Sequence, residues 1–119
     1  MLINLSNHPY DTWGEEQKVA AAVYGTVTDV LFPVVDEAAD ETYISSLAES
    51  YCSRISQMAL PDEATVHLMG ELTFTFALLK RLQQSGYTCI AATSQRLVTV
   101  NEQGDKLVHF RFCRFRKYN

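Results

Sequence analysis

The chain has 119 residues, of which 47% are hydrophobic and 20% are charged, with a formal net charge of −4. This composition is typical of a globular protein and not of a disordered or membrane one, so we expect a single domain over residues 1–119. No apolar run approaches the roughly 20 residues of a membrane-spanning helix, and the start lacks signal-peptide features, so we expect a cytoplasmic protein without a membrane partner.

Charge is unevenly distributed along the chain. Residues 1–95 hold four basic side chains against twelve carboxylates, whereas residues 96–119 hold six basic side chains against two. Binding to duplex nucleic acid requires many neutralised phosphates, so we expect no duplex partner for this acidic chain. The basic end suits a small local polyanion, or it is a strand edge whose charges prevent aggregation.

The three cysteines and three histidines show no metal-ligand spacing. Cys52, Cys89 and Cys113 each lie in an apolar run, which predicts buried free thiols. His67 and His109 lie in strand-like runs and are interpreted as ordinary partly buried or surface histidines. The sequence therefore predicts neither a metal nor another cofactor.

Strand and helix signals alternate in the first part of the chain. Residues 1–6 form a short apolar run that predicts a strand. Thr12, with Glu15 three residues later, has the spacing of a capping box and predicts a helix that ends before Gly25. The β-branched and apolar residues 26–32 predict a second strand.

The same alternation continues in the middle of the chain. Apolar residues at helical spacing over residues 44–55 predict an amphipathic helix, with Asp36 or Asp40 as its cap. Residues 65–69 predict a third strand. Residues 72–84 predict a helix that is apolar almost all round, which is typical of a central buried position.

Strand signals alone follow. Residues 87–92 predict a fourth strand, and residues 96–101 and 106–116 predict a β-hairpin joined by a short glycine-containing loop. Apolar positions in the last strand change face after Phe112, which predicts a bulge or burial on both faces. The order predicts an α/β fold: a small Rossmann-like three-layer sandwich with a mostly parallel sheet and a C-terminal antiparallel β-hairpin.

Polar side chains follow three of the predicted parallel strands. Open α/β sheets bind ligands where the carboxyl ends of their strands meet at one edge, so we expect these side chains to form one site. The candidates are Asn7 and His8 after the first strand, Gly70, Glu71, Thr73 and Thr75 after the third, and Ser94 and Arg96 after the fourth. Trp13 is a candidate for base stacking, with a core position as the alternative.

The candidates after the first and the fourth strands suit a phosphate ligand. His8 is predicted to orient a phosphate or to move a proton near neutral pH. The alternative is a plain turn in which Asn7 bonds its own backbone. Ser94 and Arg96 combine a hydroxyl with a guanidinium group, which predicts a phosphate clamp.

The helix start after Gly70 offers free N–H groups and a positive helix end to an anion. The alternative is that Thr73 caps the helix and Thr75 satisfies a backbone carbonyl. Glu71 can accept a hydrogen bond from a ligand or take a proton from a ribose 2′-hydroxyl, or it is an ordinary first-turn glutamate. No glycine-rich nucleotide loop, nucleophile elbow or triad is present, so an enzyme would depend on positioning and charge neutralisation.

Three segments together resemble a known family: Ser-Asn-His-Pro with a Trp shortly after, Met-Gly-Glu-Leu-Thr, and Thr-Ser-Gln-Arg before a hairpin. They resemble the small stand-alone Rossmann-like CRISPR-associated proteins of type III systems, relatives of the cyclic-oligoadenylate-binding CARF domains and ring nucleases. The resemblance covers most of the chain in architecture. It implies a homodimer that binds cyclic oligoadenylate across its two-fold axis in antiviral signalling and, in nuclease members, cleaves it without metal.

In that chemistry the ribose 2′-hydroxyl attacks the adjacent phosphate. The resemblance implies that the site is lined by Asn7, His8, Glu71, Thr73, Thr75, Ser94 and Arg96, with His8 and Glu71 as the candidate catalytic residues. Some members carry a basic residue near the phosphate-binding helix end, whereas none lies between Arg54 and Lys80 here. The sequence therefore supports binding more strongly than cleavage. The alternative is a non-catalytic regulatory or interaction module whose hairpin forms a dimer edge.

Overall fold

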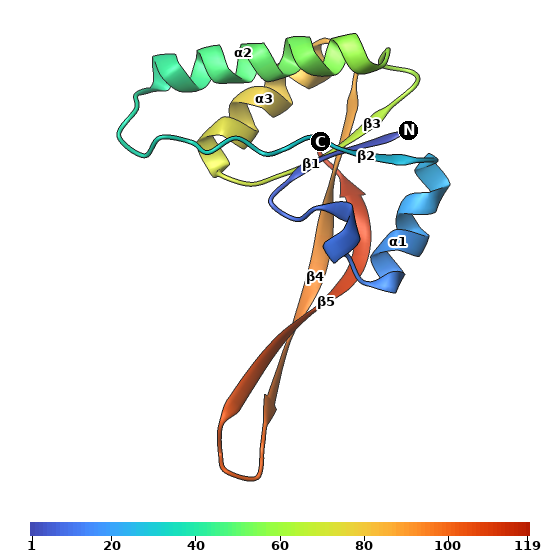
Figure 1. Ribbon diagram of the computed structural model, residues 1–119, viewed down its shortest axis with the longest axis vertical. Helices are drawn as coiled ribbons and strands as arrows, with labels where there is room; N and C mark the ends of the chain where they lie inside the picture. The colour runs from blue at the N-terminus through green and yellow to red at the C-terminus, as the bar shows by residue number, and fades with distance from the viewer.

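The computed structural model describes residues 1–119 as a five-stranded sheet with helices on both faces (Figure 1). The elements are, in chain order, β1 (Leu2–Ser6), the 3-10 helix η1 (Tyr10–Thr12), α1 (Glu15–Ala21), the 3-10 helix η2 (Ala22–Tyr24), β2 (Val27–Asp29), α2 (Glu41–Met58), β3 (Thr65–Met69), α3 (Leu72–Gln84), β4 (Thr88–Val100) and β5 (Lys106–Lys117). The predicted α/β fold, with its mostly parallel sheet and C-terminal antiparallel hairpin, is confirmed. None of the helices combines the length and apolar character that crossing a bilayer requires.

The strands lie in the order β2-β1-β3-β4-β5. The first four strands pair in parallel, and β5 pairs with β4 in the antiparallel direction. After β1 the chain first adds β2 on one side and then crosses to add β3 on the other. The neighbours β1 and β3 therefore form the switch point of the sheet, beyond whose carboxyl ends open α/β sheets bind ligands.

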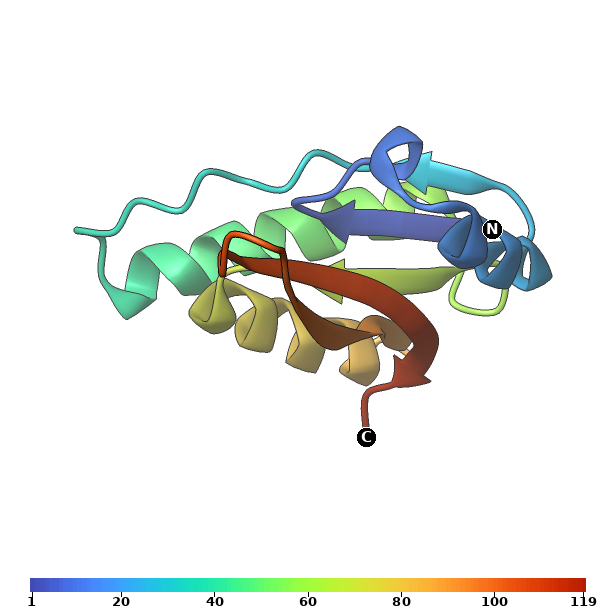
Figure 2. The same ribbon diagram turned by 90° about the horizontal axis from the view of Figure 1, so that it is seen from below.

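The two faces of the sheet carry different helices. Figure 1 shows α2 and α3 together on one side and α1 on the other, and Figure 2 shows how α1 leaves part of its face uncovered. Successive strand residues point to opposite faces, so Ile3, Leu5, Val66 and Leu68 enter the core under α2 and α3. The opposite face holds a smaller apolar cluster of Leu2, Trp13, Ala21, Ile90 and Phe115. The polar residues Asn4, Ser6 and His67 therefore point to the α1 face.

The predicted helix starts are only partly correct. The α1 helix begins at Glu15, whereas Thr12 lies in η1 and donates its hydroxyl to the carbonyl oxygen of Pro9 at 2.6 Å. Thr12 therefore closes the preceding turn and forms no capping box. The predicted cap of α2 is confirmed, because Asp40 accepts a hydrogen bond from the backbone N–H of Tyr43 at 3.0 Å.

The second strand is shorter than predicted. It spans Val27–Asp29, and Val30 still donates its N–H to the carbonyl oxygen of Asn4 at 2.8 Å. The chain then leaves the sheet because Phe32 turns into the core, where its ring packs edge-on against Phe74 at 5.3 Å. The edge strand β2 is therefore shorter than the run of β-branched and apolar residues indicates.

The helix α3 is not buried all round. Its inner face packs against α2 and the sheet, but Leu72 is 81% exposed and Phe76 is 63% exposed. The prediction of a central buried helix is wrong because α3 lies in an outer layer (Figure 1).

The hairpin of β4 and β5 extends far beyond the rest of the sheet (Figure 1). The strand β4 runs without a break through residues 93–95, so the predicted division into a strand that ends at residue 92 and another that begins at residue 96 is wrong. The strand β5 continues to pair with this segment. A register shift lies between Thr93 and Ser94, opposite the unpaired Cys113, which confirms the predicted change of face. Cys113 is exposed, not buried as predicted. We call residues 94–112, beyond this bulge, the arm.

Candidate functional site

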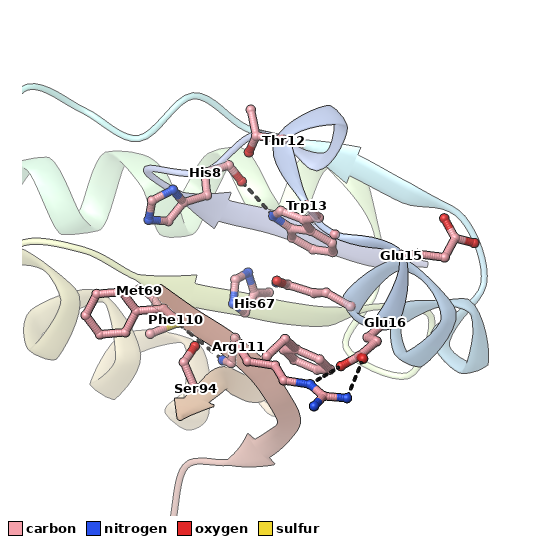
Figure 3. A pocket seen from close by; sticks show the side chains of 14 residues that line it. His8, Thr12, Trp13, Glu15, Glu16, His67, Met69, Ser94, Phe110 and Arg111 are labelled. Carbon is pink, nitrogen blue, oxygen red and sulfur yellow. Dashed lines mark hydrogen bonds and ion pairs between the residues drawn. The ribbon is translucent and has the colours of Figure 1, made fainter. Parts of the chain in front are cut away.

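A cavity of about 640 Å³ opens at the carboxyl edge of the sheet on the α1 face (Figure 3). Its walls come from the segment after β1, from the first turn of α1 with the carboxylates of Glu15 and Glu16, from β3 and β4, and from the arm. The volume lies in the range of small-molecule sites, and the position beyond β1 and β3 is the switch point of the sheet. This cavity is therefore the candidate ligand site.

The side chain of Asn4, buried on the floor beside the cavity, uses all its hydrogen-bonding capacity. Its Nδ2 donates to Oδ1 of Asp29 at 2.8 Å and to the carbonyl oxygen of His8 at 2.9 Å. Its Oδ1 accepts from Oγ of Ser6 at 2.8 Å and lies 2.8 Å from Nδ1 of His67. Carboxylate and carbonyl oxygens only accept, so these partners fix which end of the amide is oxygen.

The amide of Asn4 in turn fixes the tautomer of His67. Because Oδ1 of Asn4 can only accept, Nδ1 of His67 carries the proton, and the lone pair is on Nε2. That Nε2 atom is buried and has no hydrogen-bond partner. Burial lowers the pKa of His67 to about 4, with a smaller contribution from His8, so the ring is neutral at pH 7. The prediction of a partly buried or surface histidine is wrong, because His67 is 2% exposed.

Hydrogen bonds hold the segment after β1, residues 8–13, in place beside the cavity. The carbonyl oxygen of His8 accepts from Nε1 of Trp13 at 2.9 Å as well as from Asn4. Asp29 holds the same segment by accepting from the backbone N–H of Tyr10 at 3.2 Å. Trp13 is consequently both a core residue and a wall of the cavity. The imidazole of His8 is exposed at the cavity and is free to meet a ligand.

The arm supplies the opposite wall. Ser94 is paired with Phe112 and Arg96 with Phe110, so these four side chains share one face of the hairpin. Arg96 is exposed and forms no ion pair. Arg111, by contrast, binds Oε1 of Glu16 in α1 at 2.9 Å and joins the base of the arm to that helix (Figure 3).

The start of α3 is already occupied by a side chain of the protein. Glu71 accepts from the backbone N–H of Phe74 at 2.7 Å and of Thr73 at 3.1 Å, and from the Thr73 hydroxyl at 2.8 Å. These bonds lower the pKa of Glu71, with the Phe74 bond contributing most. Glu71, and not Thr73, is therefore the cap. The N–H groups that were predicted to bind an anion already have a carboxylate partner.

Gly70 and the threonines after it also differ from the prediction. A Cβ atom on Gly70 would lie 2.1 Å from the ring of Phe32, so the glycine is required by packing. The hydroxyl of Thr75 is buried without a partner and does not reach a backbone carbonyl. Thr73 lines a separate, smaller cavity between the starts of α2 and α3.

The structure divides the residues that the sequence predicted as one site. Three of them line the cavity: His8, Trp13 and Ser94. Arg96 lies on the same face of the arm, and Asn7 is exposed in the turn after β1, outside the lining. The group at the start of α3 also lies outside it: Gly70, Glu71, Thr73 and Thr75.

Sequence reasoning missed Asn4 and His67. The available signal was their position: each is a polar residue at the centre of an otherwise apolar strand, on the face opposite the main core. The aromatic residues Phe110 and Phe112 were assigned only to a strand pattern, yet they line the cavity.

No group of three or more His, Cys, Asp or Glu side chains is placed to hold a metal ion.

Comparison with known proteins gives a family but no further relative. No curated protein and no solved structure matches the chain. A family model matches residues 1–116, and the chain therefore belongs to the Uncharacterized protein MJ1673 family.

Proposed function

We propose that this chain is a cytoplasmic homodimer that binds a cyclic oligoadenylate second messenger in type III CRISPR antiviral signalling. The observation that carries the proposal is the cavity at the switch point, where the rings of Trp13 and Phe112 lie close to the polar groups of His8 and Ser94. Aromatic rings bind bases by stacking. Imidazole and hydroxyl groups suit ribose and phosphate oxygens.

The phosphates of the ligand are proposed to lie on the arm side of the cavity. Arg96 is exposed, has no acidic partner and shares the face of Ser94. A guanidinium group binds phosphate oxygens through two parallel hydrogen bonds. The start of α3 is a poor alternative, because a phosphate there would have to displace the carboxylate of Glu71.

The size of the ligand supports the dimer. A cavity of about 640 Å³ suits one drug-sized molecule, and a ring of four or more nucleotides is larger than this. We therefore propose that each chain holds part of the ring and that the two-fold axis passes through the ring. The arm offers a surface for the second copy, because Val98, Val108 and Phe110 are exposed on its cavity face.

We propose that His8 acts as the general base if the bound ring is cleaved. The ribose 2′-oxygen would attack the adjacent phosphorus and the 5′-oxygen would leave, while His8 takes the proton of the 2′-hydroxyl and a water molecule gives a proton to the leaving 5′-oxygen. Glu71 would have to leave its capping position to take part. Turnover lost in His8→Ala with binding retained would support this role, and unchanged turnover would exclude it.

A non-catalytic interaction module is the second candidate. The observation that favours it is the arm itself, whose exposed apolar residues include Phe110 at 71% exposure. Exposed apolar patches of this kind mark interaction surfaces. On this alternative, the arm binds another protein and the cavity carries no nucleotide.

The decisive experiment adds cyclic tetra-adenylate or cyclic hexa-adenylate at micromolar concentration and measures Tm and native-gel mobility. A ligand at one hundred times its Kd stabilises the folded state by about 2.7 kcal/mol, so we expect a clear rise in Tm. Arg96→Ala should weaken this rise, while the matched control Arg54→Ala, on the outer surface of α2, should leave it unchanged. If neither ring changes Tm or mobility, the proposal is wrong.

A further inference from the structure

Two buried side-chain atoms lack a hydrogen-bond partner: Nε2 of His67 and the hydroxyl oxygen of Thr75. Of these two residues, only His67 lines the cavity. Buried polar groups in folded proteins almost always have partners, so an exception calls for an explanation. A partner supplied by a ligand is one such explanation.

The hydrogen-bonding character of Nε2 of His67 is fixed by hydrogen bonds that the rest of the protein makes to Asn4. Asp29 and the carbonyl oxygen of His8 orient the amide of Asn4, and the amide oxygen then holds the proton on Nδ1 of His67. The ring cannot flip without breaking its 2.8 Å contact with Asn4. Nε2 is therefore a permanent acceptor in a fixed direction, and its ligand partner must be an N–H or O–H donor.

The surroundings of Nε2 select the shape of that donor. Trp13 packs edge-on against His67 at 5.5 Å, and Phe110 and Phe112 line the same cavity. Figure 3 shows the side chain of His67 on β3, between His8 and Trp13 on one side and Met69 and Ser94 on the other. Walls of this kind favour a flat ring over a sugar.

We propose that Nε2 of His67 accepts a hydrogen bond from the exocyclic amino group of a purine bound in this cavity. The inference rests on the proposed function, and it deepens that function by naming the atom that recognises the base. A ligand whose rings lack an amino group would leave Nε2 unpaired, so the cavity selects an amino-bearing base such as adenine.

The ribose is the other source of a donor, and the structure favours the amino group. The free guanidinium of Arg96 and the hydroxyl of Ser94 lie on the arm, which draws the phosphates and the riboses attached to them toward that wall. His67 lies on the sheet, at the opposite wall. A base that extends from the arm toward the sheet presents its outer edge to Nε2.

The first experiment uses the unaltered protein. Nitrogen-15 NMR of the full chain follows the Nε2 resonance of His67 during titration with cyclic tetra-adenylate. A lone-pair imidazole nitrogen moves upfield when it accepts a hydrogen bond, and this is the expected result. A cyclic tetranucleotide of purine riboside, which lacks every amino group, should bind without moving the resonance.

The second experiment compares affinities in two variants. His67→Asn retains an N–H near the position of Nδ1 for Asn4 and removes Nε2. His109→Asn makes the same chemical change at an exposed position of the arm. The unaltered chain and His109→Asn should bind the purine-riboside ring about ten- to a hundredfold more weakly than cyclic tetra-adenylate, because a ring shared by two chains loses one hydrogen bond at each of the two His67 residues. His67→Asn should bind the two rings equally.

The outcomes separate this inference from the proposed function. If cyclic tetra-adenylate binds but neither the Nε2 resonance nor the preference for amino groups responds, the inference is wrong and the function stands. The cyclic tetra-adenylate made of 2′-deoxyribose tests the ribose as the donor. If this ring binds the unaltered chain more weakly than cyclic tetra-adenylate, if His67→Asn abolishes that difference, and if the purine-riboside ring shows no loss of affinity, the donor is the ribose and the inference is wrong. If no cyclic oligoadenylate binds, the function and the inference fail together.

Discussion

Nδ1 of His67 lies 2.8 Å from Oδ1 of Asn4, its register partner on the neighbouring strand. Asn4 joins this histidine to Asp29 on β2 and to the chain that follows β1. One buried amide therefore connects β1, β2 and β3 beneath the cavity.

Removing this amide should destabilise the fold. Asn4→Ala leaves several buried groups without partners, each costing about 1–3 kcal/mol, so we expect a loss of about 2–4 kcal/mol in the free energy of unfolding. Urea denaturation measures it. Asn7→Ala is the matched control, because Asn7 is exposed and its side chain forms no hydrogen bond, and it should change stability by less than about 0.5 kcal/mol. A similar loss in both variants would contradict the account.

The histidine should make stability depend on pH. The pKa of His67 is about 4 in the folded protein against 6.5 for a free histidine, so the unfolded chain binds the extra proton more readily between these values. This contribution to stability is complete above pH 6.5 and is lost as the pH falls toward 4, by about 3 kcal/mol.

His67→Asn tests this dependence by comparison with the unaltered chain. Carboxylates titrate in the same range in both proteins, so the difference between their stability curves isolates His67. We expect the two curves to converge as the pH falls from 6.5 to 4. Parallel curves over this range, or an NMR titration of His67 centred near 6.5, would show that the ring is not buried as described.

The cap of α3 should also be measurable. Glu71→Ala removes the hydrogen bonds to the N–H groups of Thr73 and Phe74, and loss of a cap costs about 0.5–2 kcal/mol. Glu49→Ala, at an exposed position in the middle of α2, is the control and should change little. Equal thermal stability of Glu71→Ala and the unaltered chain would mean that the carboxylate does not cap the helix in solution.

The arm should control assembly. Val108→Glu places a charge on the apolar face that we assign to the second copy, and Thr99→Glu places the same charge on the opposite face. We expect Val108→Glu to be a monomer in analytical ultracentrifugation, while Thr99→Glu remains a dimer. A monomeric unaltered chain, or dimers of both variants, would exclude this face as the interface.

Side-chain alternation explains how far the sequence could predict the site. The sequence predicted a strand over residues 1–6. In that strand the structure places Ile3 and Leu5 in the core, and side-chain alternation puts Asn4 on the other face. The partner of Asn4 depends on which strand lies beside β1. His67 is 63 residues away along the chain, and local patterns carry no information on that pairing.

The other differences between prediction and structure arise because another group of the protein forms the hydrogen bonds in question, which a local motif does not reveal. A helix start was expected to bind an anion, but Glu71 is close enough to bond the same N–H groups itself. Thr93 and Ser94 have the polarity of a loop, yet they remain in a strand because β5 pairs with them. His8, after β1, does share one cavity with Ser94 of the arm, while Asn7 and the cluster after β3 lie outside its lining.

The central claim is that two chains share one cyclic oligoadenylate, and calorimetric titration tests it most directly. Cyclic tetra-adenylate titrated into the full chain should release heat and saturate at one ring for every two chains. Saturation at one ring per chain would contradict the shared site, and the absence of heat with both cyclic tetra-adenylate and cyclic hexa-adenylate would contradict the function itself.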